Sequence, residues 1–131
     1  MEKNVLDTEY VLFEFFDGVL ICEYKAGLEI DLTIAKKMVL SRLDISNGKS
    51  YPLLMDGSGL KSLNREAREY FNSEEAREGI IAAAFFSGSV FTTYIGNFFI
   101  DITVIKPKIP TKLFTDKGKA LQWLEKYKKS I

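Results

Sequence analysis

The sequence contains no histidine, which excludes imidazole general bases and zinc sites built on histidine ligands. It contains one cysteine, Cys22, so no disulfide can form within the chain. Neither sign of charge is in excess, with 18 Lys and Arg residues against 18 Asp and Glu residues, and this balance argues against a nucleic-acid binder that relies on a broad basic surface. Apolar residues are not scarce: they make up 47% of the 131 residues, which predicts one folded domain over residues 1–131.

The sequence also lacks the features of a secreted or membrane-spanning protein. Residues 1–10 carry three acidic side chains, where a secretory leader has a basic and then an apolar segment, so we expect a cytoplasmic protein. The region 80–100 has 21 residues without a charge, which is long enough for a membrane span. Its Ser, Thr, Gly and Asn residues split it into an apolar strand and an amphipathic helix, so we expect no transmembrane span.

Two β-rich runs near the N-terminus predict a hairpin. Apolar residues dominate 10–16 and 19–25, and Asp17-Gly18 separates the two runs. Asp-Gly favours a two-residue hairpin turn because both residues tolerate a positive φ angle. We therefore expect antiparallel strands over these two ranges.

A capped helix is predicted over about 32–45. Asp31 or Thr33 provides the N-cap, and Asn47-Gly48 provides the left-handed residue with which a helix commonly ends. An apolar stripe faces the interior. The residues expected on the opposite, solvent face are Lys36, Lys37 and Arg42.

The rest of the chain alternates apolar runs with helical patterns. Runs without alternation predict strands buried on both faces over 51–55 and 80–86, and a last short strand covers 111–115. Helices are predicted over 64–71, over 73–78, from about 90 and from Asp116. The element order is ββαβαβαβα. It predicts an α/β fold with a small mixed sheet, in which βα crossovers give parallel pairing and the N-terminal β-hairpin adds an antiparallel edge.

This element order, together with two short motifs, resembles the SpoIIAA-like (STAS/SEC14-type) family of small bacterial proteins. The motifs are Asp56-Gly57-Ser58-Gly59 and Leu113-Phe114-Thr115-Asp116 … Ala120 … Trp123-Leu124. The resemblance covers residues 10–128 and implies a small mixed sheet with helices packed against it, no cofactor and no enzymatic activity. The better-known relatives are anti-sigma-factor antagonists switched by serine phosphorylation, and lipid-carrier-like domains.

The loop Asp56-Gly57-Ser58-Gly59 is the first candidate site. In the antagonists the phosphorylated serine directly follows the aspartate, whereas here Gly57 takes that position and Ser58 matches the second serine. A glycine-rich turn after a parallel strand is also where α/β folds place ligand or phosphate sites, next to the N-terminus of the following helix. The alternative is a plain strand-to-helix turn that needs glycine for its φ angles.

The apolar helix predicted over 90–104 is the second candidate. It has more apolar side chains than a helix packed on one face of a sheet needs. The surplus fits core packing, a pocket for an apolar ligand, an interface with a partner or a second copy, or contact with a membrane surface. The aromatic candidates for such a surface are Phe91, Tyr94, Phe98 and Phe99.

Cys22 lies within the second strand of the predicted hairpin. Its neighbours are Ile21 and Glu23, and we expect no basic group nearby that would lower the pKa of its thiol. We expect a small, buried or half-buried residue.

Two functions fit these patterns. The first is a non-enzymatic regulatory or protein-interaction module, whose working surface is the 56–59 loop with the adjoining segment 60–72. The alternative is a carrier or sensor of a lipid or other apolar small ligand with an anionic head, held between the sheet and the 90–104 helix. For both we expect no catalytic residue, no metal site and no cofactor. A homodimer and a peripheral membrane contact stay open.

Overall fold

Two residues in the left-handed backbone conformation form the turn of the predicted N-terminal hairpin. Asp17 and Gly18 have φ angles of 50° and 82°. Strands β2 (Val11–Phe16) and β3 (Val19–Tyr24) pair antiparallel on either side of this turn. The hairpin is therefore confirmed, because Asp-Gly supplies the backbone angles that a two-residue turn requires.

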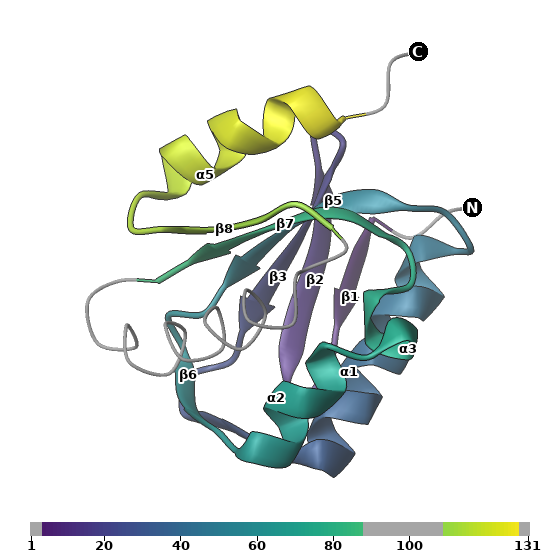
Figure 1. Cartoon of the computed structure of the whole chain (residues 1–131), viewed down its shortest axis with the longest axis vertical. Coiled ribbons are helices and arrows are strands. Elements are labelled where there is room, and N and C mark those ends of the chain that lie inside the picture. Colours follow the sequence, from purple (N-terminus) through teal and green to yellow (C-terminus); the bar gives the residue numbers. More distant parts are fainter. Residues whose placement is uncertain (1–3, 88–108, 129–131) are drawn as a thin grey trace.

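Further strands extend the hairpin into a six-stranded sheet in the computed structural model, which describes residues 4–87 and 109–128 (Figure 1). The added strands are β1 (Val5–Asp7), β5 (Tyr51–Asp56), β7 (Ile80–Phe86) and β8 (Thr111–Phe114). The sheet order is β1-β2-β3-β5-β7-β8. The pairs among β1, β2 and β3 are antiparallel, and those among β3, β5, β7 and β8 are parallel. This pairing confirms the predicted α/β fold with a mixed sheet.

Helices cover both faces of the sheet (Figure 1). On one face, α1 (Leu32–Ser46) packs against β1 and β2, and α2 (Arg65–Phe71) packs against α1. The short helix α3 (Glu74–Arg77) follows α2. On the other face, α5 (Lys117–Leu124) packs against β5 and β7 and continues into a 3-10 turn, η2 (Glu125–Tyr127).

The helices begin at the residues that the sequence indicates. Asp31, not Thr33, is the N-cap of α1, and its Oδ1 accepts a hydrogen bond from the backbone N–H of Ile34 at 2.8 Å. Side chains in the same role begin the other α-helices of the described ranges, and these N-caps are Asn64, Ser73 and Asp116. Such caps satisfy backbone N–H groups that have no partner within the helix.

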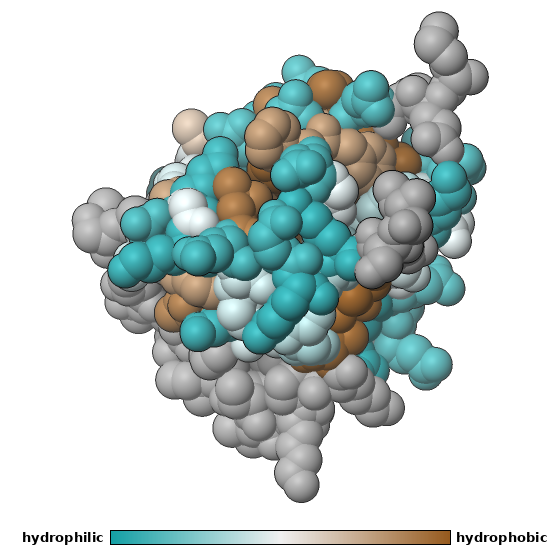
Figure 2. Space-filling model, turned by 90° about the horizontal axis from the view of Figure 1, so that it is seen from above, coloured by the Kyte–Doolittle hydropathy of each residue, from teal (hydrophilic) through white to brown (hydrophobic). Residues whose placement is uncertain are grey.

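Each face of the sheet carries its own core, because neighbouring strand residues point to opposite sides. Leu53 of β5 belongs to the core under α1 and α2, whereas the next residue, Leu54, belongs to the core under α5. Ala83 and Ala84 of β7 divide in the same way. Both strands are therefore buried on two faces, as predicted. Seen from the α5 side, hydrophilic residues surround smaller hydrophobic areas of the described surface (Figure 2).

Three short strands are missing from the sequence prediction. They are β1, β4 (Leu28–Ile30) and β6 (Leu60–Leu63), and β4 pairs parallel to β6 in a separate two-stranded sheet. Segments of three or four residues are too short to show a periodic pattern. The 56–59 loop consequently joins β5 to β6, so the prediction of a strand-to-helix turn is wrong. The next helix begins only at Arg65.

Arg42 also departs from its predicted place. It is 5% exposed, so it is not on the solvent face with Lys36 and Lys37. Residue 42 lies four positions after Met38 and three after Val39, and both of these are buried. Residues at these spacings share one side of a helix, which explains why Arg42 points inward.

Candidate functional site

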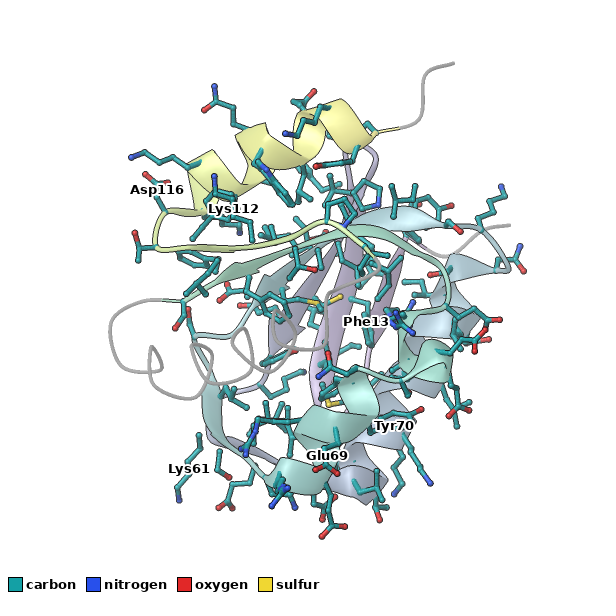
Figure 3. The ribbon with its side chains drawn as sticks, in the orientation of Figure 1. Phe13, Lys61, Glu69, Tyr70, Lys112 and Asp116 are labelled. Atoms are coloured by element: carbon teal, nitrogen blue, oxygen red, sulfur yellow. The ribbon has the colours of Figure 1, made fainter. Side chains whose placement is uncertain are left out.

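A cavity of about 100 Å³ lies on the sheet face that α1, α2 and α3 cover. The strands contribute Phe13, Leu53 and Ala83 to its wall, and α1 contributes Met38 and Val39. Phe13 lies on this side of the sheet, in one core cluster with Met38 of α1 (Figure 3). The cavity is thus lined by residues that come from distant parts of the sequence.

The wall of the cavity is mostly apolar and has no acidic side chain among its described residues. Of the 22 described residues that line it, two are charged, and both are arginines: Arg42 and Arg77. The other polar side chains of the described wall are Cys22, Tyr24, Asn72 and Thr111. The composition therefore combines an apolar interior with a few polar groups and positive charge.

Arg42 is fixed by hydrogen bonds to the backbone at the end of α3. Its Nη1 donates to the carbonyl oxygen of Glu78 at 2.8 Å, and its Nη2 donates to that of Ala76 at 2.9 Å. No ion pair among the described residues involves Arg42. Burial lowers the pKa of this guanidinium from its ordinary value, because the charged form loses hydration.

Cys22 and Tyr24 reach the same cavity from β3. Cys22 is buried, as predicted, and burial raises the pKa of its thiol to about 12 even though the Arg42 charge acts to lower it. The expectation that no basic group approaches this thiol is wrong, because Arg42 comes from another element of the fold. Burial also raises the pKa of the Tyr24 phenol. Both groups are therefore uncharged near neutral pH.

The 56–59 loop follows β5 at its carboxyl end, and Gly57 also lines the cavity. The N–H of Gly57 donates to the carbonyl oxygen of Phe86 at 2.9 Å, which ties the loop to the end of β7. The N–H of Ser58 donates to Oδ1 of Asp56 at 3.1 Å, so the aspartate closes the turn. Ser58 itself is exposed.

Gly59 is required by close packing, not by an unusual φ angle. A Cβ atom at this position would lie 2.4 Å from the carbonyl oxygen of Tyr24 and 2.6 Å from that of Lys25. The backbone N–H of Leu28 also donates to the carbonyl oxygen of Gly59 at 3.1 Å. The loop is therefore held against the chain segment that joins β3 to β4.

The second sequence candidate cannot be placed. Phe91, Tyr94, Phe98 and Phe99, with the whole helix predicted over 90–104, lie outside the described residues. Over 4–87 and 109–128, no helix is long and apolar enough to cross a membrane. Of the candidate loop, Gly57 alone is a cavity-lining residue. Arg42 is not among the site residues predicted from the sequence, although its helical spacing from Met38 and Val39 shows that it shares their buried side.

One solved structure confirms the predicted fold. It is that of an uncharacterized protein from the DUF3478 family with a SpoIIAA-like fold from Shewanella loihica PV-4, which is 15% identical over 87% of this chain and 91% of that chain, with a TM-score of 0.60. A protein with unknown function from Arthrobacter sp. FB24 is 21% identical over 95% of this chain and 94% of that chain, but its TM-score of 0.31 is too low to bear on the fold. No curated protein matches the chain.

The sequence itself matches a family model. The model describes a domain of unknown function (DUF7793), and the match covers residues 13–128. This span runs from within β2 to just past η2, and it includes both Arg42 and the 56–59 loop. The chain therefore belongs to the DUF7793 family.

Proposed function

We propose that the chain is a non-enzymatic binding module that holds an apolar small molecule in the cavity beneath α1, α2 and α3. The observation that carries this proposal is an apolar cavity of about 100 Å³ with a few polar groups in its wall. Ligand pockets in proteins typically have this composition. An engineered apolar cavity of about 150 Å³ in another protein stays dry and binds benzene, so a cavity of similar size suits a compact ligand.

The polar groups of the wall support binding without turnover. Burial keeps the Cys22 thiol protonated, and a protonated thiol is a weak nucleophile. No carboxylate among the described lining residues is available to act as a general base beside it. These groups offer hydrogen bonds that orient a ligand.

Solvent extraction of the purified protein, followed by mass spectrometry of the extract, tests this function. A mock purification from cells without the protein serves as the control. We expect a compound enriched in the protein sample, with an apolar body small enough for the cavity. An extract that matches the mock purification, from protein prepared without detergent, would count against the function.

A second candidate function is protein interaction through the 56–59 loop. The observation that favours it is the exposure of Ser58 at the carboxyl end of a central strand, where a modification or a partner has access. A phosphoryl group on Ser58 would add about 1.5 to 2 negative charges beside Asp56. Ser58→Asp should therefore alter partner recovery in a pull-down, while Ser58→Ala should not. Equal recovery with both variants and the unmodified protein would exclude this switch.

A further inference from the structure

The two charged groups in the described wall of the cavity are of one sign, and both lie beside α3. Arg77 belongs to α3, and Arg42 donates its hydrogen bonds to the carbonyl groups of Ala76 and Glu78 on either side of it. Both arginines line the cavity. Most of the other described lining residues are apolar, Phe13 and Leu53 of the sheet among them. The cavity therefore combines positive charge beside α3 with a mostly apolar wall.

Arg42 uses only part of its donor capacity on the described residues. A guanidinium has five N–H donors, and the hydrogen bonds of Arg42 to described residues use Nη1 and Nη2 once each. The side chain is 5% exposed, so water does not readily hydrate the rest of the group. A buried charge that forms no ion pair is costly, and an anion that enters the cavity would offset this cost.

The acidic residues near Arg42 do not supply that anion. Burial lowers the pKa of Arg42 while the charge of Glu78 acts to raise it, but Glu78 is exposed and the atom that bonds to Arg42 is its backbone carbonyl oxygen. Glu75 is exposed and accepts a hydrogen bond from the Tyr70 hydroxyl at 3.0 Å. Neither residue lines the cavity. The positive charge beside α3 is thus complementary to a negative group carried by a ligand.

We propose that the ligand of this cavity is a compact apolar carboxylate, with its apolar body over the sheet and its carboxylate at Arg42. This inference rests on the proposed function, since it requires that the cavity binds a small molecule at all. A carboxylate suits the planar guanidinium, because the two groups can form parallel N–H···O bonds. The ligand class is therefore a ring-sized or branched apolar acid.

Binding of benzoate and benzamide separates this inference from the proposed function, because the two probes have nearly the same shape and differ in charge. Dissociation constants are measured by calorimetry at pH 7.5, and the Arg42 Nε–H resonance is followed by NMR in the unsubstituted protein. We expect benzoate to bind at least about tenfold more tightly than benzamide. Benzoate, but not benzamide, should move the Arg42 Nε–H resonance strongly.

The variants Arg42→Met and Arg77→Met show which arginine causes the preference for benzoate over benzamide. We expect Arg42→Met to remove the preference for benzoate while benzamide binds as before, and Arg77→Met to retain most of it. Equal binding of the two probes to the unsubstituted protein would overturn the inference but leave the proposed function standing. Binding of neither probe would overturn both. If Arg42→Met does not fold, the unsubstituted protein alone tests the inference, through the ratio of the benzamide and benzoate dissociation constants and the Arg42 Nε–H resonance. A ratio near one, or a resonance that benzoate does not move, overturns the inference.

Discussion

Gly59→Ala should lower the free energy of unfolding by about 3 kcal/mol, at the upper end of the cost of overpacking an interior. The added Cβ atom would lie 2.4 Å from the carbonyl oxygen of Tyr24 and 2.6 Å from that of Lys25. Both atoms belong to the backbone, so no side chain can turn aside to make room. The loop and the segment after β3 would have to separate, which would also strain the hydrogen bond from the N–H of Leu28 to the carbonyl oxygen of Gly59.

Gly27→Ala is the matched control for this prediction. Gly27 has a φ angle of 77°, and an added Cβ atom there would meet nothing within 4 Å. Gly27→Ala should lower the free energy of unfolding by about 1 kcal/mol, because alanine is strained at this positive φ angle. Urea unfolding followed by circular dichroism measures both variants. If Gly59→Ala lowered the free energy of unfolding no more than Gly27→Ala does, the 56–59 loop would not be packed closely against the segment after β3.

Ala83→Leu and Ala84→Leu should differ in their effect on stability, although the two alanines are neighbours in β7. Ala83 is 3% exposed and lines the cavity, so a larger side chain there enters existing space. Ala84 is 0% exposed and packs in the core with Ala120 and Leu124 of α5. We expect Ala84→Leu to destabilise the protein by about 2 kcal/mol and Ala83→Leu to leave stability unchanged or raise it.

The difference in stability between the two leucine variants is measured by their urea midpoints, provided that the slopes of the two unfolding transitions are equal. Equal slopes show that both variants expose similar surface on unfolding. An Ala83→Leu variant as unstable as Ala84→Leu would mean that the space beside β7 is filled. The cavity would then be absent from the protein in solution.

The parts of the fold that the sequence predicts correctly depend on local signals. Asp17-Gly18 defines the hairpin because the turn needs the φ angles that these two residues adopt readily. Asp31 begins α1 and Asn47, with a φ angle of 51°, ends it, because caps act within one turn of a helix. The buried run 51–55 identifies a strand covered on both faces, because it lacks polar alternation.

The parts that the sequence does not predict depend on contacts between distant residues. Strands β4 and β6 exist through their pairing with each other, and each is too short to show a pattern alone. The cavity forms where α1, α3 and the sheet meet, so it has no counterpart in any single stretch of sequence. Arg42 of α1 acts on Cys22 of β3, and the sequence does not predict this proximity either, because the two residues belong to separate elements.

The helical spacing of Arg42 predicts that it is buried, whereas its charge predicts that it is exposed. A helical arginine is ordinarily placed on the solvent face because burying its charge is costly. The spacing from Met38 and Val39 predicts the opposite, and the structure follows the spacing. When the period of a helix and the polarity of a residue disagree, the polar residue is a candidate for a site.

Uptake of toluene, followed by methyl NMR, tests the central claim of a ligand cavity on the α1 side of the sheet most directly. Leu53 and Met55 report on the cavity, and Leu54 and Leu124 report on the opposite face under α5. We predict saturable shifts confined to the cavity methyl groups, and their loss in Ala83→Leu. Unmoved cavity resonances, or shifts shared by both faces, would contradict the account.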